Sequence, residues 1–143
     1  MKFIIEFLCI ILISMIFVSI DLNNYSGECI INLENPQKIS AFFLIVIHHI
    51  IATTANFGWL CYSKPMLLLF LITIITIMII GFVNQGCFIT RKVNKYCNLP
   101  DRHFFNDFFY IIGLKKHDYW LSYGHYIFYS LITIFAIYKF FIL

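Results

Sequence analysis

The sequence carries little charge. Asp, Glu, Lys and Arg make up 12% of its 143 residues, whereas apolar residue types make up 62%, and a typical soluble domain has about 25% charged residues. A soluble fold of this length would have to expose many Ile, Phe and Leu side chains to water. The composition therefore excludes a soluble globular protein, a disordered chain and a nucleic-acid-binding module, and it predicts an integral membrane protein.

The sequence also lacks the short motifs that identify common reactions. It has no phosphate-binding loop and no zinc-binding spacing, and none of its five cysteines forms a Cys-x-x-Cys pair. We therefore expect no enzyme activity and no cofactor, and we predict a structural or partner-binding membrane component. Its expected partners are the lipid bilayer and another membrane protein or a second copy of the chain, and not nucleic acid.

Four apolar runs are long enough to cross a bilayer, which takes about 20 helical residues. They cover residues 3–20, 41–62, 66–83 and 120–141. In lipid, a run of this length satisfies its backbone polar groups only as a helix. The sequence thus predicts an all-α fold, a four-helix membrane bundle in a single domain of residues 1–143. The first run could instead be a secretory signal, but it lacks a good cleavage site, so we favour a retained helix.

The connections between the runs differ in length. Residues 63–65 form a tight hairpin, whereas residues 21–40 form a polar loop that is broken by Pro36. The longest connection covers residues 84–119 and carries most of the charge. Within it, residues 101–113 are predicted to form a short amphipathic helix that lies in the membrane interface.

Charge indicates how the chain is oriented. Four spans place residues 21–40 and 84–119 on one side of the membrane, and both termini with residues 63–65 on the other. The first side carries seven Lys and Arg residues and the second carries three. The positive-inside rule therefore predicts that the two longer connections are cytoplasmic, although Lys2 before the first run favours the reverse.

Polar residues within the apolar runs are the best candidates for a site, because an unpaired polar group in hydrocarbon is costly. The stripe of His49, Thr53 and Asn56 has helical i, i+4, i+7 spacing, so we expect it to face the bundle interior and to hydrogen-bond to the third run. The candidates are His48, His49, Thr53 and Asn56 in the second run, Thr73 and Thr76 in the third, and His125 in the fourth.

Two alternative functions follow from the histidines and cysteines. His49 and His125 could ligate the iron of a haem b, which would make the protein an electron carrier. Cys29, Cys87 and Cys97 lie on one side of the membrane and could form a thiol–disulfide oxidoreductase. Cytoplasmic connections would keep these thiols reduced, and the structural or partner-binding interpretation remains the first prediction.

The segment after the third run resembles a family signature. Residues 84–90, Asn-Gln-Gly-Cys-Phe-Ile-Thr, are similar to the Cys-Pro-Leu-Thr motif of a family of small bacterial multi-span membrane proteins of unknown function. Residues 47–48 and 56–58 are similar to an earlier span of that family, and residues 104–110 to its aromatic segment. Phe88 stands where the family has proline. The resemblance implies a compact four-helix bundle and singles out three positions, His48, Cys87 and Thr90.

Overall fold

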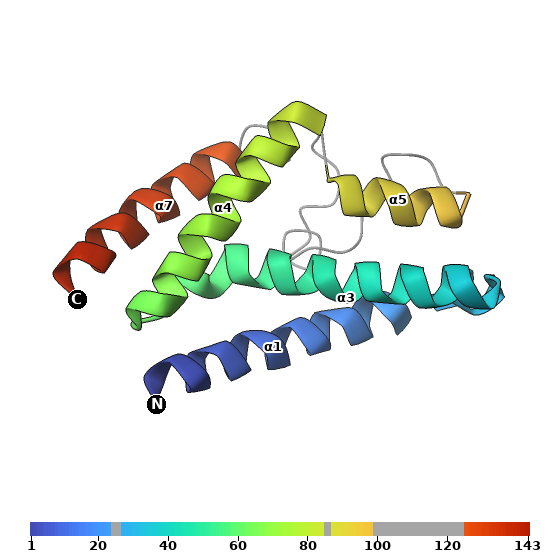
Figure 1. Ribbon diagram of the computed structural model, residues 1–143, viewed down its shortest axis with the longest axis horizontal. Helices are drawn as coiled ribbons and strands as arrows, with labels where there is room; N and C mark the ends of the chain where they lie inside the picture. The colour runs from blue at the N-terminus through green and yellow to red at the C-terminus, as the bar shows by residue number, and fades with distance from the viewer. Residues whose placement is uncertain (24–26, 85–86, 99–124) are drawn as a thin grey trace.

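The computed structural model describes residues 1–23, 27–84, 87–98 and 125–143, and all regular structure within these ranges is helical (Figure 1). The elements are α1 (Lys2–Asp21), α2 (Gly27–Asn32), α3 (Asn35–Phe57), the short 3-10 helix η2 (Gly58–Leu60), α4 (Lys64–Asn84), α5 (Phe88–Tyr96) and α7 (His125–Ile142). The predicted all-α class is confirmed for these residues.

Three helices are long and apolar enough to cross a membrane: α1, α3 together with η2, and α4. Their outer faces are apolar, with Leu12, Leu68 and Ile79 each about half exposed or more. The fourth predicted run corresponds to α7, whose apolar part, Tyr126–Ile142, is shorter than these three. The first residues of that run, and the interfacial helix expected over residues 101–113, lie outside the described residues.

The helices pack as two pairs that meet at one end of the molecule. Figure 1 shows α1 lying along α3 and α4 lying along α7, with the turn between α3 and α4 near both termini. Gly58 makes this turn possible, because a Cβ atom there would lie 2.9 Å from Cβ of Phe70. Phe70 is fully buried in a core shared by α3, α4 and α7.

Two charged side chains join the helices at this end. The Glu6 carboxylate of α1 accepts hydrogen bonds from the Ser63 hydroxyl and from the backbone N–H groups of Tyr62 and Ser63. Lys139 of α7 donates to the carbonyl oxygens of Trp59 and Leu60. The orphan backbone groups at the end of η2 and the start of α4 are therefore satisfied by partners from other helices.

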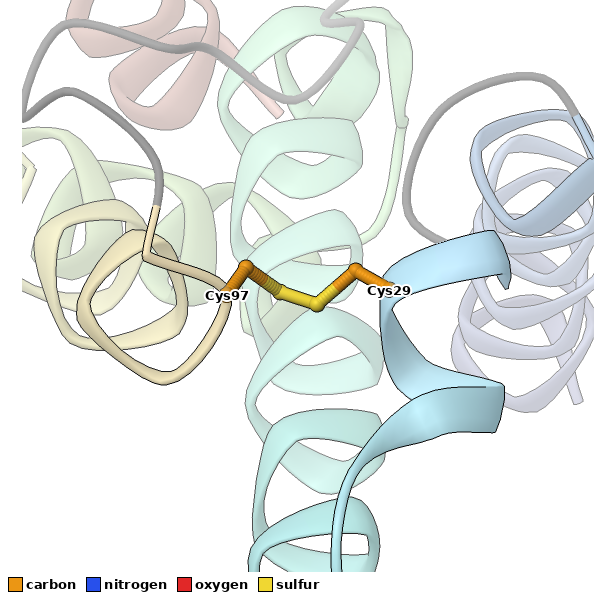
Figure 2. The surroundings of a disulfide bond; sticks show 2 residues. All are labelled: Cys29 and Cys97. Atoms are coloured by element: carbon orange, nitrogen blue, oxygen red, sulfur yellow. A yellow bond between two sulfur atoms is a disulfide. The ribbon is translucent and has the colours of Figure 1, made fainter.

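The opposite end differs from the predicted polar loop at residues 21–40. Most of that segment is helical, since it contains α2 and the start of α3, and Pro36 lies in the first turn of α3, where proline is tolerated. A second short helix, α5, packs on the same part of α3. A disulfide between Cys29 of α2 and Cys97 after α5 joins the two short helices (Figure 2), with 5.7 Å between the Cα atoms.

Candidate functional site

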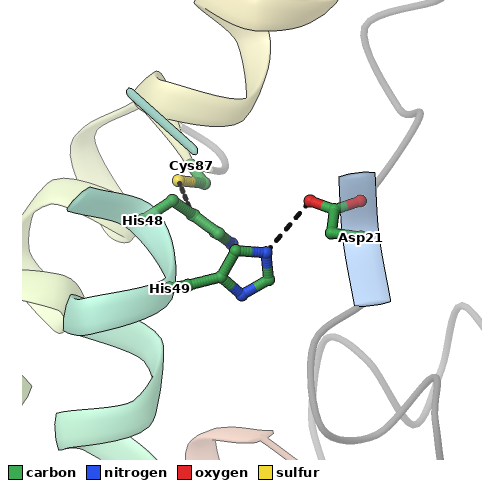
Figure 3. A network of polar contacts seen from close by, with 4 residues as sticks. All are labelled: Asp21, His48, His49 and Cys87. Carbon is green, nitrogen blue, oxygen red and sulfur yellow. Dashed lines mark hydrogen bonds and ion pairs between the residues drawn. The ribbon is translucent and has the colours of Figure 1, made fainter. Parts of the chain in front are cut away.

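A cluster of polar side chains lies where the end of α1, the middle of α3 and the start of α5 meet. Asp21 is the last residue of α1, His48 and His49 are neighbours on α3, and Cys87 directly precedes α5 (Figure 3). The rings of His48 and His49 lie edge to face, with 5.5 Å between their centroids. Adjacent histidines on one helix point to different neighbours, so the cluster contains two separate contacts.

The first contact is a buried pair. His49 Nε2 lies 3.0 Å from Asp21 Oδ2, and both side chains are essentially inaccessible. Phe17 of α1 stacks on the His49 ring, with 6.4 Å between the centroids. Because a buried carboxylate is costly unless it is hydrogen-bonded, this pair couples the end of α1 to α3.

The second contact joins a thiol to an imidazole. Cys87 Sγ lies 3.6 Å from His48 Nδ1, and Cys87 itself is exposed. Partial burial raises the pKa of the Cys87 thiol, but hydrogen bonds from His48 and Thr90 and the charge of His48 outweigh it and lower the pKa to about 6. Cys87 also occupies the N-cap position of α5, where the helix dipole favours an anion.

This arrangement favours the thiolate form of Cys87. A thiol with a pKa of about 6 is roughly nine-tenths thiolate at pH 7, and the thiolate is the reactive form of cysteine. An imidazole next to a thiol is a group that can transfer a proton during exchange. Thr90, buried one turn into α5, fixes the first turn that places Cys87 against α3.

The predicted stripe on α3 is buried but makes different contacts from those expected. Asn56 donates to the Ala52 carbonyl and accepts a hydrogen bond from Tyr129 of α7. Thr53 is 2% exposed, and its hydroxyl has no hydrogen-bond partner among the residues that the structure describes. The stripe therefore faces the interior as predicted, and its interhelical hydrogen bonds go to α1 and α7.

The expected partners on the third run, Thr73 and Thr76, do not meet this stripe. Thr73 donates to the Leu69 carbonyl of its own helix, and Thr76 is exposed. The physical reason is that α4 turns its other face, which carries Leu67, Phe70 and Ile74, into the core. A threonine on a membrane helix can satisfy its hydroxyl within its own helix and needs no partner from elsewhere.

The haem hypothesis requires that His49 and His125 are both available as iron ligands. His49 Nε2 is taken by Asp21, and His125 begins α7, with its side chain outside what the structure describes. No group of three or more His, Cys, Asp or Glu side chains among the described residues could hold a metal ion. Haem binding remains a prediction that a visible absorption spectrum of the purified protein would test.

The three cysteines of the oxidoreductase hypothesis are not brought together. Cys29 and Cys97 form the disulfide, whereas Cys87 lies at the other end of α5. Ten helical residues correspond to about 15 Å, so Cys87 does not reach this disulfide directly. Asp21, which the sequence places in a polar loop, is the residue that the sequence reasoning missed. The sequence feature that could have identified Asp21 is its position as an acidic residue directly after the first apolar run.

The chain matches no known protein family, and no curated protein or solved structure matches it either. The resemblance to the small bacterial multi-span proteins therefore remains a prediction.

Proposed function

We propose that the protein is a partner-binding integral membrane component that engages its partner through thiol–disulfide exchange at Cys87. The observation that carries the proposal is the contact between Cys87 Sγ and His48 Nδ1 at the start of α5. A thiolate prepared by an adjacent imidazole and a helix N-terminus is the arrangement that reactive cysteines share. The exposure of Cys87 allows a partner to reach it.

The membrane placement rests on the apolar helices. Three helices are long enough to span, and their exposed faces carry large apolar side chains that lipid would cover. We propose that α7, with the residues before it, makes the fourth span of a multi-pass bundle. The polar cluster then lies level with the end of the first span, which Asp21 marks, and halfway along α3.

The proposed reaction is a thiol–disulfide exchange between Cys87 and a disulfide of the partner. The Cys87 thiolate attacks one sulfur of a disulfide on the partner, the partner's sulfur–sulfur bond breaks, and a mixed disulfide forms. The released partner sulfur leaves as a thiolate and takes up a proton from water. The partner's disulfide is the oxidant, and the reverse attack by the released thiol restores Cys87.

The disulfide supports an orientation opposite to the one that the charge count predicts. Disulfides persist in oxidising compartments and are rare in the cytosol, so Cys29 and Cys97 would face away from the cytosol. The positive-inside rule is a statistical bias, whereas a lasting disulfide requires an oxidising surrounding. We therefore propose that α2, α5 and Cys87 lie on the non-cytosolic side.

The test is the pH dependence of exchange with a small disulfide reagent. In a Cys9→Ala, Cys61→Ala background Cys87 is the only free thiol, and dithiobis(nitrobenzoate) reports exchange by colour. We expect a rate that falls as the pH drops through about 6, following the pKa of Cys87. His48→Gln should move the midpoint toward the ordinary value of about 8.5 and slow exchange at pH 5.5 on the order of tenfold.

The matched control is Cys87→Ser in the same background, which should give no colour. A midpoint near 8.5 in the parent protein, or one that His48→Gln leaves unchanged, would contradict the proposal and favour a purely structural role. Trapping of a membrane protein by the parent but not by Cys87→Ser, released by reductant, would identify the partner.

A further inference from the structure

An open pocket lies at the end of the molecule opposite the disulfide. It has a volume of about 310 Å³ and is formed between the end of η2 and the last turns of α7. Its walls include Trp59, Tyr62, Phe135, Tyr138 and Lys139. The proposed function does not use any of these residues.

The walls are apolar, and their aromatic residues are of the kind found at membrane surfaces. Trp59 and Phe135 pack edge to face with 5.8 Å between their centroids, while Tyr62 and Tyr138 are both more than half exposed. Trp and Tyr gather at the level of the lipid headgroups. In the membrane placement proposed above, on which this inference rests, the pocket opens beside lipid at the depth where acyl chains meet headgroups.

Lys139 places a positive charge in the wall of this pocket. Lys139 Nζ lies 3.7 Å from the centroid of the Tyr62 ring and donates to the carbonyls of Trp59 and Leu60. The two carbonyls and the ring engage its three hydrogens, but Lys139 forms no ion pair with a carboxylate among the described residues, so its positive charge is not neutralised by direct contact. The nearby Glu6 carboxylate is already engaged by the backbone N–H groups of Tyr62 and Ser63 and by the Ser63 hydroxyl.

The charge at this end is predominantly positive. Lys64, at the start of α4, lies 5.9 Å from the Phe140 ring centroid, and Lys2 begins α1 at the same end of the bundle. Among the described residues of this end, Glu6 is the one acidic side chain. An anionic group on the occupant would complement this charge.

We propose that the pocket binds an anionic phospholipid, with an acyl chain against Trp59 and Phe135 and the phosphate on Lys139. An anionic lipid matches both properties of the pocket, since its acyl chain fits the apolar walls and its phosphate complements the positive charge of Lys139. If Cys87 faces the non-cytosolic side, this pocket lies in the cytosolic leaflet, where anionic lipids attract lysine. The lipid site itself does not depend on that orientation.

The experiment uses Trp59 as the reporter. The sequence has two tryptophans, Trp59 and Trp120, so the full chain with Trp120→Phe has a single fluorophore in the pocket wall. It is reconstituted in phosphatidylcholine bilayers that contain brominated phosphatidylglycerol or brominated phosphatidylcholine. We expect phosphatidylglycerol to quench Trp59 with a relative binding constant about threefold to fivefold higher.

Lys139→Gln should remove this preference, Lys139→Arg should retain it, and Lys2→Gln is the matched control that removes a charge at the same end but outside the pocket. Equal quenching by the two lipids, an unchanged preference in Lys139→Gln, or an equal loss in Lys2→Gln would overturn the proposal. If Lys139→Gln does not fold, competition between brominated and unbrominated lipids in the parent chain tests the proposal instead. Unbrominated phosphatidylglycerol should relieve quenching, and phosphatidylcholine at the same fraction should not.

Discussion

At the residue scale, the molecule places its few polar groups where a second group can satisfy them. Asp21 and His49 are buried together, and Glu6 finds backbone N–H groups at the start of α4. His48 and Cys87 differ from these pairs, because Cys87 remains exposed. The buried contacts hold helices together, and the exposed one is free to react.

The buried pair leads to a stability prediction. Asp21→Ala should destabilise the fold by about 1–3 kcal/mol, because it removes one hydrogen-bond partner of the buried His49 ring. Unfolding in mixed detergent, followed by circular dichroism, would measure the change. Thr76→Ala, which alters an exposed residue of α4, should change the unfolding free energy by less than about 0.5 kcal/mol. A loss of equal size in both variants would contradict the role of the pair.

At the element scale, the two ends of the bundle are held by different devices. The turn between α3 and α4 depends on a close approach of backbone to Phe70. At the other end, the disulfide fastens α2 to the end of α5, and α5 buries Thr90, Val93 and Asn94 against its surroundings. Short helices such as α2 and α5 are marginal on their own, so their placement depends on these contacts.

The turn can be tested with two glycines. Gly58→Ala should destabilise the protein by about 1–3 kcal/mol, because its Cβ would meet Phe70 Cβ at 2.9 Å. Gly81→Ala is the control, since its Cβ would meet only Tyr126 Oη, at 3.9 Å. Alanine in a helix interior is favoured over glycine, so this variant should be neutral or slightly stabilising. Thermal unfolding measures both, and equal losses would contradict the tight approach at Gly58.

The disulfide leads to a second prediction at this scale. The Cys29→Ser, Cys97→Ser variant should lose about 2–4 kcal/mol, because the bond closes a loop across a sequence separation of 68 residues. Amide hydrogen exchange within residues 88–96 should accelerate most, since α5 loses its anchor there. Cys9→Ser, which alters an exposed free thiol, should leave the exchange unchanged. Unaltered protection of α5 in the double variant would show that packing alone holds it.

At the scale of the whole molecule, the two proposed sites lie apart along the length of the bundle. The disulfide lies at one end, the lysine-bearing pocket lies at the other, and the Cys87 cluster lies between them against the middle of α3. The proposed orientation places the first end outside the cytosol. It reverses the prediction from the count of Lys and Arg and agrees with the local signal of Lys2.

Labelling in intact cells tests this orientation. In a chain without Cys9 and Cys61, a membrane-impermeant maleimide should modify Cys87 from outside before lysis. With Cys87 also replaced by Ser, a cysteine introduced at Lys64 should react only after the cells are opened. The reverse pattern would place the disulfide in the cytosol and would restore the orientation that the charge count predicts.

The sequence by itself determined the helical class, the apolar spans and the inward-facing stripe on α3. These properties follow from local composition and helical period, which do not depend on neighbours in space. The sequence did not determine which residues the stripe contacts. Helical spacing shows which residues share a face, but it does not show which helix covers that face. Thr73 and Thr76 were predicted as partners because they follow a short hairpin, yet α4 turns an apolar face inward.

Only the tertiary structure decided which polar residues meet. Asp21 and His49, like Cys87 and His48, are far apart in the chain, and the pairing of Cys29 with Cys97 was one of several that the sequence allowed. The sequence did not predict helix α5, because this helix is short and amphipathic and contains no long apolar run. Packing on α3 and the disulfide hold it in place. The reactivity proposed for Cys87 rests on its contact with His48, which forms only when the start of α5 lies against the middle of α3.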